Sequence, residues 1–147
     1  MDQNYRIQVV EDQYFVALDC QQALEEAGLV CSGVAATAEQ AIELARRDHP
    51  DLILMDIRLS GAMDGVDAAL RIFRDQGIRC VFSSAHSDPG TRQRAEEAQP
   101  LGWLQKPYNC THVVDAVRTA LAKLEEEAAY SRAQRPAERR SVNGDGR

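Results

Sequence analysis

Five polar residues have side chains that could form one chemical site: Glu11, Asp12, Asp56, Ser84 and Lys106. Three carboxylates brought together repel one another unless a cation joins them, and Mg²⁺ suits a small set of carboxylates. Lys106 can pair with one carboxylate or with a phosphoryl oxygen, and the Ser84 hydroxyl can donate to another such oxygen. A carboxylate nucleophile, a metal and a cation are the parts needed to form an aspartyl phosphate.

Asp56 fits the nucleophile best because it follows an apolar, rigid run of residues, 51–56. Taken alone, each residue has a plainer interpretation. The Glu11-Asp12 pair reads as solvated strand-end charge, Asp56 as a turn or cap residue, and Lys106 as a solvated side chain. The hypothesis of a site therefore depends on whether the surrounding elements place these residues together.

Short apolar runs alternate with helical patterns along the chain. Strands are predicted at 6–10, 29–34, 51–56, 80–83 and 103–105, and helices at 15–27, 37–48, 64–74, from 87–89 onward and after Asn109. The continuous apolar centre of 51–56 is typical of a parallel strand covered on both faces. Five strands alternating with five helices predict an α/β fold with a parallel sheet between helices. In such sheets ligands bind beyond the carboxyl ends of the strands, where all five polar residues fall.

Length and charge limit the other classes of protein. The chain has 147 residues, which suits one compact domain, expected at 1–127, and 128–147 is predicted to be a mostly disordered tail. The first 124 residues carry 18 acidic and 12 basic side chains, which argues against nucleic-acid binding. The four cysteines lack a zinc-like spacing and are expected to be free thiols. No signal peptide or membrane-spanning run is recognised, so a cytoplasmic location is expected.

At these residues the sequence resembles the receiver domain of two-component response regulators, over about residues 6–124. The matching elements are the acidic pair Glu11-Asp12, Asp56 as phosphoacceptor, Ser84-Ala85, Lys106-Pro107, the aromatic Trp103 three residues before the lysine, and Met63-Asp64-Gly65. Each element is weak alone, but their order and spacing together are specific. The resemblance implies a flavodoxin-like, doubly wound five-stranded parallel sheet in the order 2-1-3-4-5, with five helices.

The resemblance also implies roles for these residues. Mg²⁺ or Mn²⁺ would be held by Glu11, Asp12, Asp56 and the backbone carbonyl of Arg58. Asp56 would take a phosphoryl group from a histidine kinase or a histidine phosphotransfer protein.

Ser84 and Lys106 would contact the phosphate, and Trp103 would switch rotamer. That switch would remodel the face of helix 4, strand 5 and helix 5 toward a protein target, or toward a second copy of the chain. Arg58 and His86 are candidates to tune the lifetime of the aspartyl phosphate, although both also suit plain surface positions.

Two departures from the family pattern stand out. The loop from Arg58 to Gly65 is one residue longer than the commonest spacing, with Ser60 where proline is usual. Trp103 also replaces the more usual tyrosine or phenylalanine.

The favoured function is a stand-alone receiver: a signalling switch that catalyses only its own phosphorylation and dephosphorylation. Its output would be a protein contact or onward transfer of the phosphoryl group in a phosphorelay. The alternative is a degenerate receiver that binds a partner independently of phosphorylation. A phosphatase of the haloacid dehalogenase type is disfavoured because Arg58 stands where that family has a second aspartate. A transcription factor is disfavoured because no basic helix-turn-helix segment follows Leu124.

Overall fold

The computed structural model describes residues 4–86 and 88–135. Its elements are β1 (Arg6–Val10), α1 (Tyr14–Glu26), β2 (Val30–Ala35), α2 (Ala38–Asp48), β3 (Leu52–Asp56), α3 (Gly65–Gln76), β4 (Cys80–Ser84), α4 (Pro89–Ala95), a 3₁₀ turn (Glu96–Ala98), β5 (Gly102–Gln105) and α5 (Cys110–Ala133). The five strands are parallel and pair in the order β2-β1-β3-β4-β5. The predicted fold class and strand order are both confirmed.

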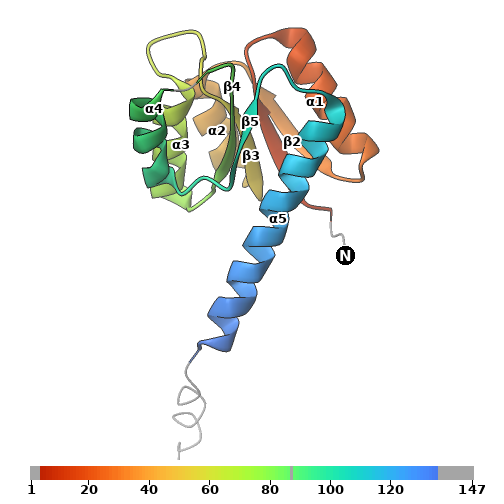
Figure 1. Ribbon diagram of the computed structural model, residues 1–147, viewed down its shortest axis with the longest axis vertical. Helices are drawn as coiled ribbons and strands as arrows, with labels where there is room; N and C mark the ends of the chain where they lie inside the picture. Colours follow the sequence, from red (N-terminus) through yellow and green to blue (C-terminus); the bar gives the residue numbers. More distant parts are fainter. Residues whose placement is uncertain (1–3, 87, 136–147) are drawn as a thin grey trace, which may run out of the picture.

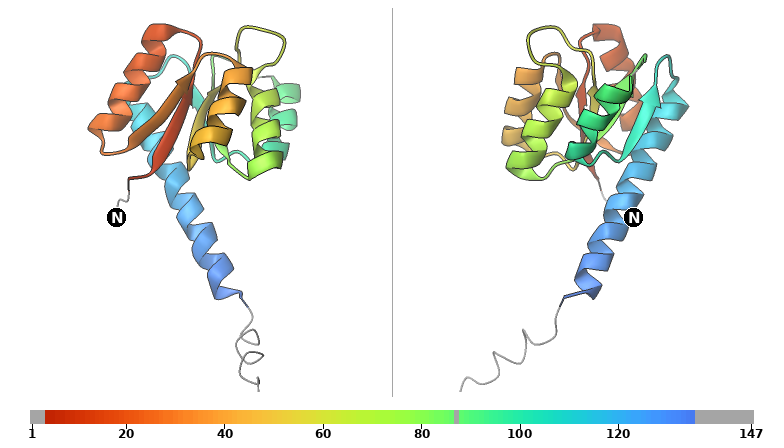
Figure 2. Two further views of the ribbon diagram at one scale, coloured as in Figure 1. Left: turned by 180° about the vertical axis from the view of Figure 1, so that it is seen from behind. Right: turned by 60° about the vertical axis from the view of Figure 1, so that its left-hand side comes forward.

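The sheet lies between two layers of helices (Figures 1 and 2). On one face α2, α3 and α4 pack around residues such as Met55, Phe82 and Ile72, and on the other α1 and α5 pack around Leu54, Val81 and neighbouring side chains. All five residues of β3 and all five of β4 are buried. Because both faces of these strands are covered, each begins with a continuous apolar run, 52–55 in β3 and 80–82 in β4, rather than an alternating pattern.

Local capping signals set where several helices begin. The side chains of Asp64 and Asn109 each accept a hydrogen bond from the backbone N–H three residues later, that of Asp67 and of His112. In return, the Asp67 and His112 side chains accept the backbone N–H of Asp64 and Asn109, which completes two capping boxes. Thr37 caps α2 by accepting the N–H of Gln40 at 3.1 Å. The Gln40 side chain accepts the N–H of Ala36 instead of that of Thr37, so a complete capping box does not form at the start of α2.

The C-terminal helix is longer than predicted. The segment from residue 128 was expected to belong to a disordered tail, but α5 continues to Ala133 and projects from the body of the domain (Figures 1 and 2). The reason is helix propensity: Glu125-Glu126-Glu127 and the alanines that follow are good helix formers although they present no apolar stripe. The rest of the predicted tail, 136–147, lies outside the described residues.

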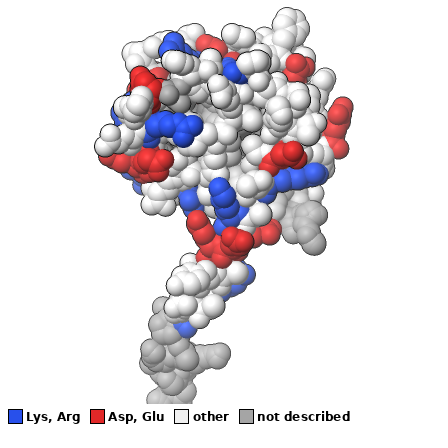
Figure 3. Space-filling model, viewed as in Figure 1, with Lys and Arg blue, Asp and Glu red and all other residues white. Residues whose placement is uncertain are grey.

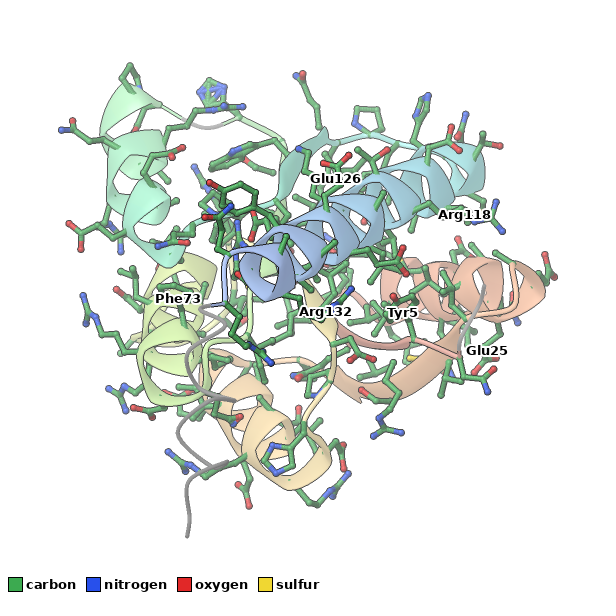
Figure 4. The ribbon with its side chains drawn as sticks, turned by 90° about the horizontal axis from the view of Figure 1, so that it is seen from below. Tyr5, Glu25, Phe73, Arg118, Glu126 and Arg132 are labelled. Carbon is green, nitrogen blue, oxygen red and sulfur yellow. The ribbon has the colours of Figure 1, made fainter. Side chains whose placement is uncertain are left out.

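The end of the domain from which α5 projects lies opposite the carboxyl ends of the strands. There Tyr5 lies close to α5 and donates its hydroxyl to Glu125 (Figure 4). A cavity of about 420 Å³ at this end is lined by Tyr5, Leu121 and Arg118 among others. The four cysteines are free thiols, as predicted. Across residues 4–86 and 88–135, no helix combines the length and the apolar character needed to span a membrane.

Candidate functional site

Three carboxylates meet at the carboxyl edge of the sheet. β1 and β3 are paired neighbours, with Val10 opposite Met55, so the residues that follow β1 lie beside the last residue of β3. One carboxylate oxygen from each of Glu11, Asp12 and Asp56 lies within 4.8 Å of the others. Glu11 and Asp56 are both 3% exposed, whereas Asp12 is open to solvent. The prediction that strand ends would bring these acids together is therefore confirmed as geometry.

Lys106 reaches this cluster from β5. Its Nζ donates to Glu11 Oε1 at 2.9 Å and to Asp56 Oδ2 at 3.1 Å. The backbone N–H of Lys106 donates to the carbonyl of Ser84, which holds the end of β5 against β4. The peptide bond between Lys106 and Pro107 is cis. One ammonium group thus bridges two buried carboxylates.

The electrostatics of the cluster follow from burial and charge count. Burial, together with repulsion from Glu11, raises the pKa of Asp56 to about 6, although Lys106 acts in the opposite direction. Burial lowers the pKa of Lys106, but its bonds to the two carboxylates outweigh this and leave that pKa above its usual value. The single lysine does not balance three carboxylates, so the cluster retains an affinity for a further cation. This donor set, three carboxylates with one open to solvent, fits a hard divalent ion such as Mg²⁺.

The loop after β3 folds back over the site. The backbone N–H of Arg58 donates to Asp56 Oδ1 at 3.3 Å, and the Ser60 hydroxyl donates to Asp12 Oδ2 at 3.2 Å. Ser60, noted as a departure from the family pattern, therefore touches one of the three acids. The proposed role of the Arg58 carbonyl as a metal ligand stays a prediction.

Ser84 and His86 lie at the end of the next strand. β4 pairs with β3, and Ser83 lies opposite Asp56. Ser84 therefore lies one residue farther toward the carboxyl edge of the sheet than Asp56. Ser84 is buried, and its Oγ accepts the backbone N–H of His86 at 3.0 Å. Ser83 is buried as well. The His86 side chain is exposed and lines the same cavity as Ser84.

Trp103 lies on β5, opposite Phe82 of β4. The indole is half-buried against Phe82, with ring centroids 5.1 Å apart. The guanidinium carbon of Arg92 on α4 lies 4.1 Å from the centroid of the Trp103 ring. A cavity of about 370 Å³ extends from Ser84 to Trp103 and Arg92.

Two residues escaped prediction as functional residues. A Cβ on Gly65 would lie 1.9 Å from the backbone carbonyl oxygen of Asp56, so glycine is required where α3 begins beside the acidic site. The sequence flagged Gly65 only as part of a motif. The sequence did not indicate a role for Arg92, because its contact with Trp103 joins α4 to β5.

Comparison with solved structures places the fold in a known class. The signal receiver domain of a modulated diguanylate cyclase from Desulfovibrio desulfuricans G20 is 32% identical, with a TM-score of 0.76 over 83% of this chain and 97% of that one. A CheY-like response regulator receiver domain protein from Methanospirillum hungatei JF-1 is 21% identical, with a TM-score of 0.78 over 85% of this chain and 99% of that one. The second likeness shows the fold alone.

The family model described as response regulator receiver domain matches residues 7–118, and the chain belongs to this family. Among curated proteins, the sporulation initiation phosphotransferase F of Bacillus subtilis is 29% identical over 119 residues, which are 80% of this chain and 94% of that protein. The transcriptional regulatory protein PdtaR of Mycobacterium tuberculosis is 30% identical over 124 residues, or 84% of this chain. This chain spans only 60% of the length of PdtaR.

Membership of the family establishes the general kind of activity. Receiver domains of two-component systems are signalling switches rather than conventional enzymes, and they interact with kinases or phosphotransferases. The acidic cluster of this chain is of the kind that can hold Mg²⁺. The roles of the individual side chains in this protein are matters for proposal.

Proposed function

We propose that this protein accepts a phosphoryl group on Asp56 from a histidine kinase or a histidine phosphotransfer protein. The modified domain then either switches a protein-binding face or passes the phosphoryl group on in a phosphorelay. The observation that carries the proposal is the position of the Asp56 carboxylate, buried at the end of β3 between Glu11 and Lys106.

The geometry supports the following chemistry. An oxygen of the Asp56 carboxylate attacks the phosphorus of the donor, and the bond from phosphorus to the donor's histidine nitrogen breaks as the new bond to oxygen forms. A carboxylate with a pKa of about 6 remains mostly ionised at pH 7.5 and needs no base to activate it. In this proposal Lys106 releases Asp56 and pairs with a phosphoryl oxygen, and the buried Ser84 hydroxyl donates to another.

Mg²⁺ held by Glu11, Asp12 and Asp56, with the Arg58 carbonyl as a further proposed ligand, would neutralise the charge of the incoming phosphoryl oxygens. The hydrogen bond from Ser60 orients the Asp12 carboxylate, the one acid of the three that is open to solvent. An oriented carboxylate loses less freedom when a metal binds, so we assign Ser60 a supporting role in the metal site.

Two surfaces suit the partners that this function requires. Tyr14 and Phe15, 70% and 75% exposed, stack edge to face at the start of α1, two residues beyond Asp12. Exposed aromatic side chains beside the acidic site suit contact with the protein that donates the phosphoryl group. The face formed by α4, β5 and α5 is mostly uncharged at its middle, with charged side chains gathered over α4 and where α5 leaves the body of the domain (Figure 3). We assign this face to the downstream protein.

The decisive experiment is intact-mass spectrometry after incubation with a small phosphodonor such as acetyl phosphate. Wild type and Asp56→Asn are compared, each with and without Mg²⁺. A gain of one phosphoryl mass that requires both Mg²⁺ and Asp56 is the expected result. Labelling of Asp56→Asn would move the acceptor to another residue. No labelling of the folded wild type under any condition would refute the proposal in favour of a receiver that binds partners without phosphorylation.

A further inference from the structure

The only tryptophan of the chain is held between a buried ring and a cation. On the sheet side, Trp103 packs against Phe82, which is fully buried in the core. On the α4 side, the guanidinium carbon of Arg92 lies over the indole, 4.1 Å from the ring centroid. This distance is well inside the range in which a guanidinium is attracted by the negative face of an indole. The contact joins α4 to β5 at the edge of the face that the proposed function assigns to a downstream protein.

Space for movement lies next to this contact. The cavity of about 370 Å³ is lined by both partners, Arg92 and Trp103, and also by Ser84 at the end of β4. It therefore connects the indole to Ser84, which directly follows Ser83, the residue paired with Asp56. Any rotation of the indole that takes its face off the Arg92 guanidinium loses this attraction. The contact with Arg92 consequently favours the orientation of Trp103 seen in the structure.

We propose that Arg92 is a positioning residue that holds Trp103 in its present orientation and so opposes the switch of this domain. The proposal rests on the proposed function of Asp56. It adds a residue on α4 whose loss makes the domain easier to activate. A ligand shifts an equilibrium between two orientations only by its difference in affinity for them. A contact present in one orientation of Trp103 and absent from the other therefore changes the concentration of phosphoryl ligand needed to switch that orientation.

The expected size follows from the kind of contact. Arg92 is exposed and Trp103 half-buried, and a cation–π contact at such a site changes an equilibrium constant by roughly two- to five-fold. Loss of Arg92 should therefore loosen Trp103 before any ligand is added and lower the ligand concentration needed for the switch.

The first measurement tests the contact without any phosphoryl ligand. Acrylamide quenching of Trp103 fluorescence is compared between wild type, Arg92→Ala and Arg94→Ala. The Arg94→Ala substitution removes the same charge from the same helix. The Arg94 guanidinium, however, pairs with Asp64 and Asp67 and not with the indole. We expect a higher quenching constant for Arg92→Ala than for the other two proteins, with far-ultraviolet circular dichroism unchanged. Equal quenching of Arg92→Ala and wild type would overturn the proposal.

The second measurement tests the effect on the switch. Beryllofluoride, a stable mimic of the phosphoryl group, is titrated with Mg²⁺ in excess, and Trp103 emission is followed. The midpoint for Arg92→Ala should fall roughly two- to five-fold below that of wild type and of Arg94→Ala. An unchanged or higher midpoint for Arg92→Ala would overturn the proposal. Failure of wild type to bind beryllofluoride would refute the proposed function instead, and the quenching result would still decide whether Arg92 holds Trp103.

Discussion

Replacement of Asp56 by asparagine should make the folded protein more stable at neutral pH. The Asp56 carboxylate is buried beside Glu11, and its pKa is raised from 3.8 to about 6. At about 1.4 kcal/mol per pKa unit, the ionised form costs the folded state about 3 kcal/mol. Asparagine has nearly the same shape, carries no charge and can still accept a hydrogen bond from Lys106. We therefore expect Asp56→Asn to raise the free energy of unfolding by about 2–3 kcal/mol at pH 7.5.

The pH dependence gives this prediction a definite sign. The folded protein binds a proton on Asp56 more tightly than the unfolded chain does. The free-energy cost of keeping Asp56 ionised in the folded state is therefore fully present above about pH 6. As the pH falls from about 6 to about 4, wild type takes up this proton in the folded state and gains stability. The difference between wild type and Asp56→Asn should therefore narrow over this range.

Urea unfolding followed by circular dichroism, at pH 7.5 and pH 4.5 with divalent ions chelated, measures both effects. Asp115→Asn, an exposed carboxylate on α5, is the matched control and should change stability little at either pH. Our account of the site would be wrong if Asp56→Asn were no more stable than wild type at pH 7.5. It would also be wrong if the difference persisted unchanged at pH 4.5.

Three further perturbations test other parts of the structure. Lys106→Ala removes the ammonium between two buried carboxylates and should destabilise the protein by about 2 kcal/mol in chelator. Added Mg²⁺ should restore much of the lost stability in thermal melts. The control Lys123→Ala should show no such rescue. Gly65→Ala places a Cβ 1.9 Å from a backbone oxygen and should cost about 2–3 kcal/mol in urea unfolding, while Gly90→Ala, with its nearest atom at 3.7 Å, should fold normally. Deletion of 131–147 should leave the melting temperature within about 2 °C of wild type, because the described part of that segment is exposed; a larger fall would contradict the exposed position of the end of α5.

Most elements of the fold could be predicted because their signals are local. The apolar run ending at Asp56 marks a buried strand, and Gly77 ends α3 in the left-handed conformation that glycine favours. Boundaries differed by one or two residues at several elements. The larger difference lies beyond residue 127, where a mostly disordered tail was expected but helix propensity extends α5 to Ala133.

The composition of the acidic site was also predictable, because strand ends of a parallel sheet share one edge. Glu11, Asp12 and Asp56 are brought together as that rule requires. The hydrogen bond from Ser60 to Asp12 was not foreseen, since it depends on the path of a loop with no repeating pattern.

The sequence by itself determined which residues form strands and helices, and which side chains reach the carboxyl edge of the sheet. Only the tertiary structure decided how those side chains pair. Lys106 meets Glu11 across 95 residues of chain and Asp56 across 50, and no local pattern encodes such a contact. Burial, which raises the pKa of Asp56, and the stacking of Arg92 on Trp103 likewise arise only when separate elements pack together. The physical reason is that periodicity and capping act over a few residues, whereas desolvation and pairing depend on neighbours that the whole fold supplies.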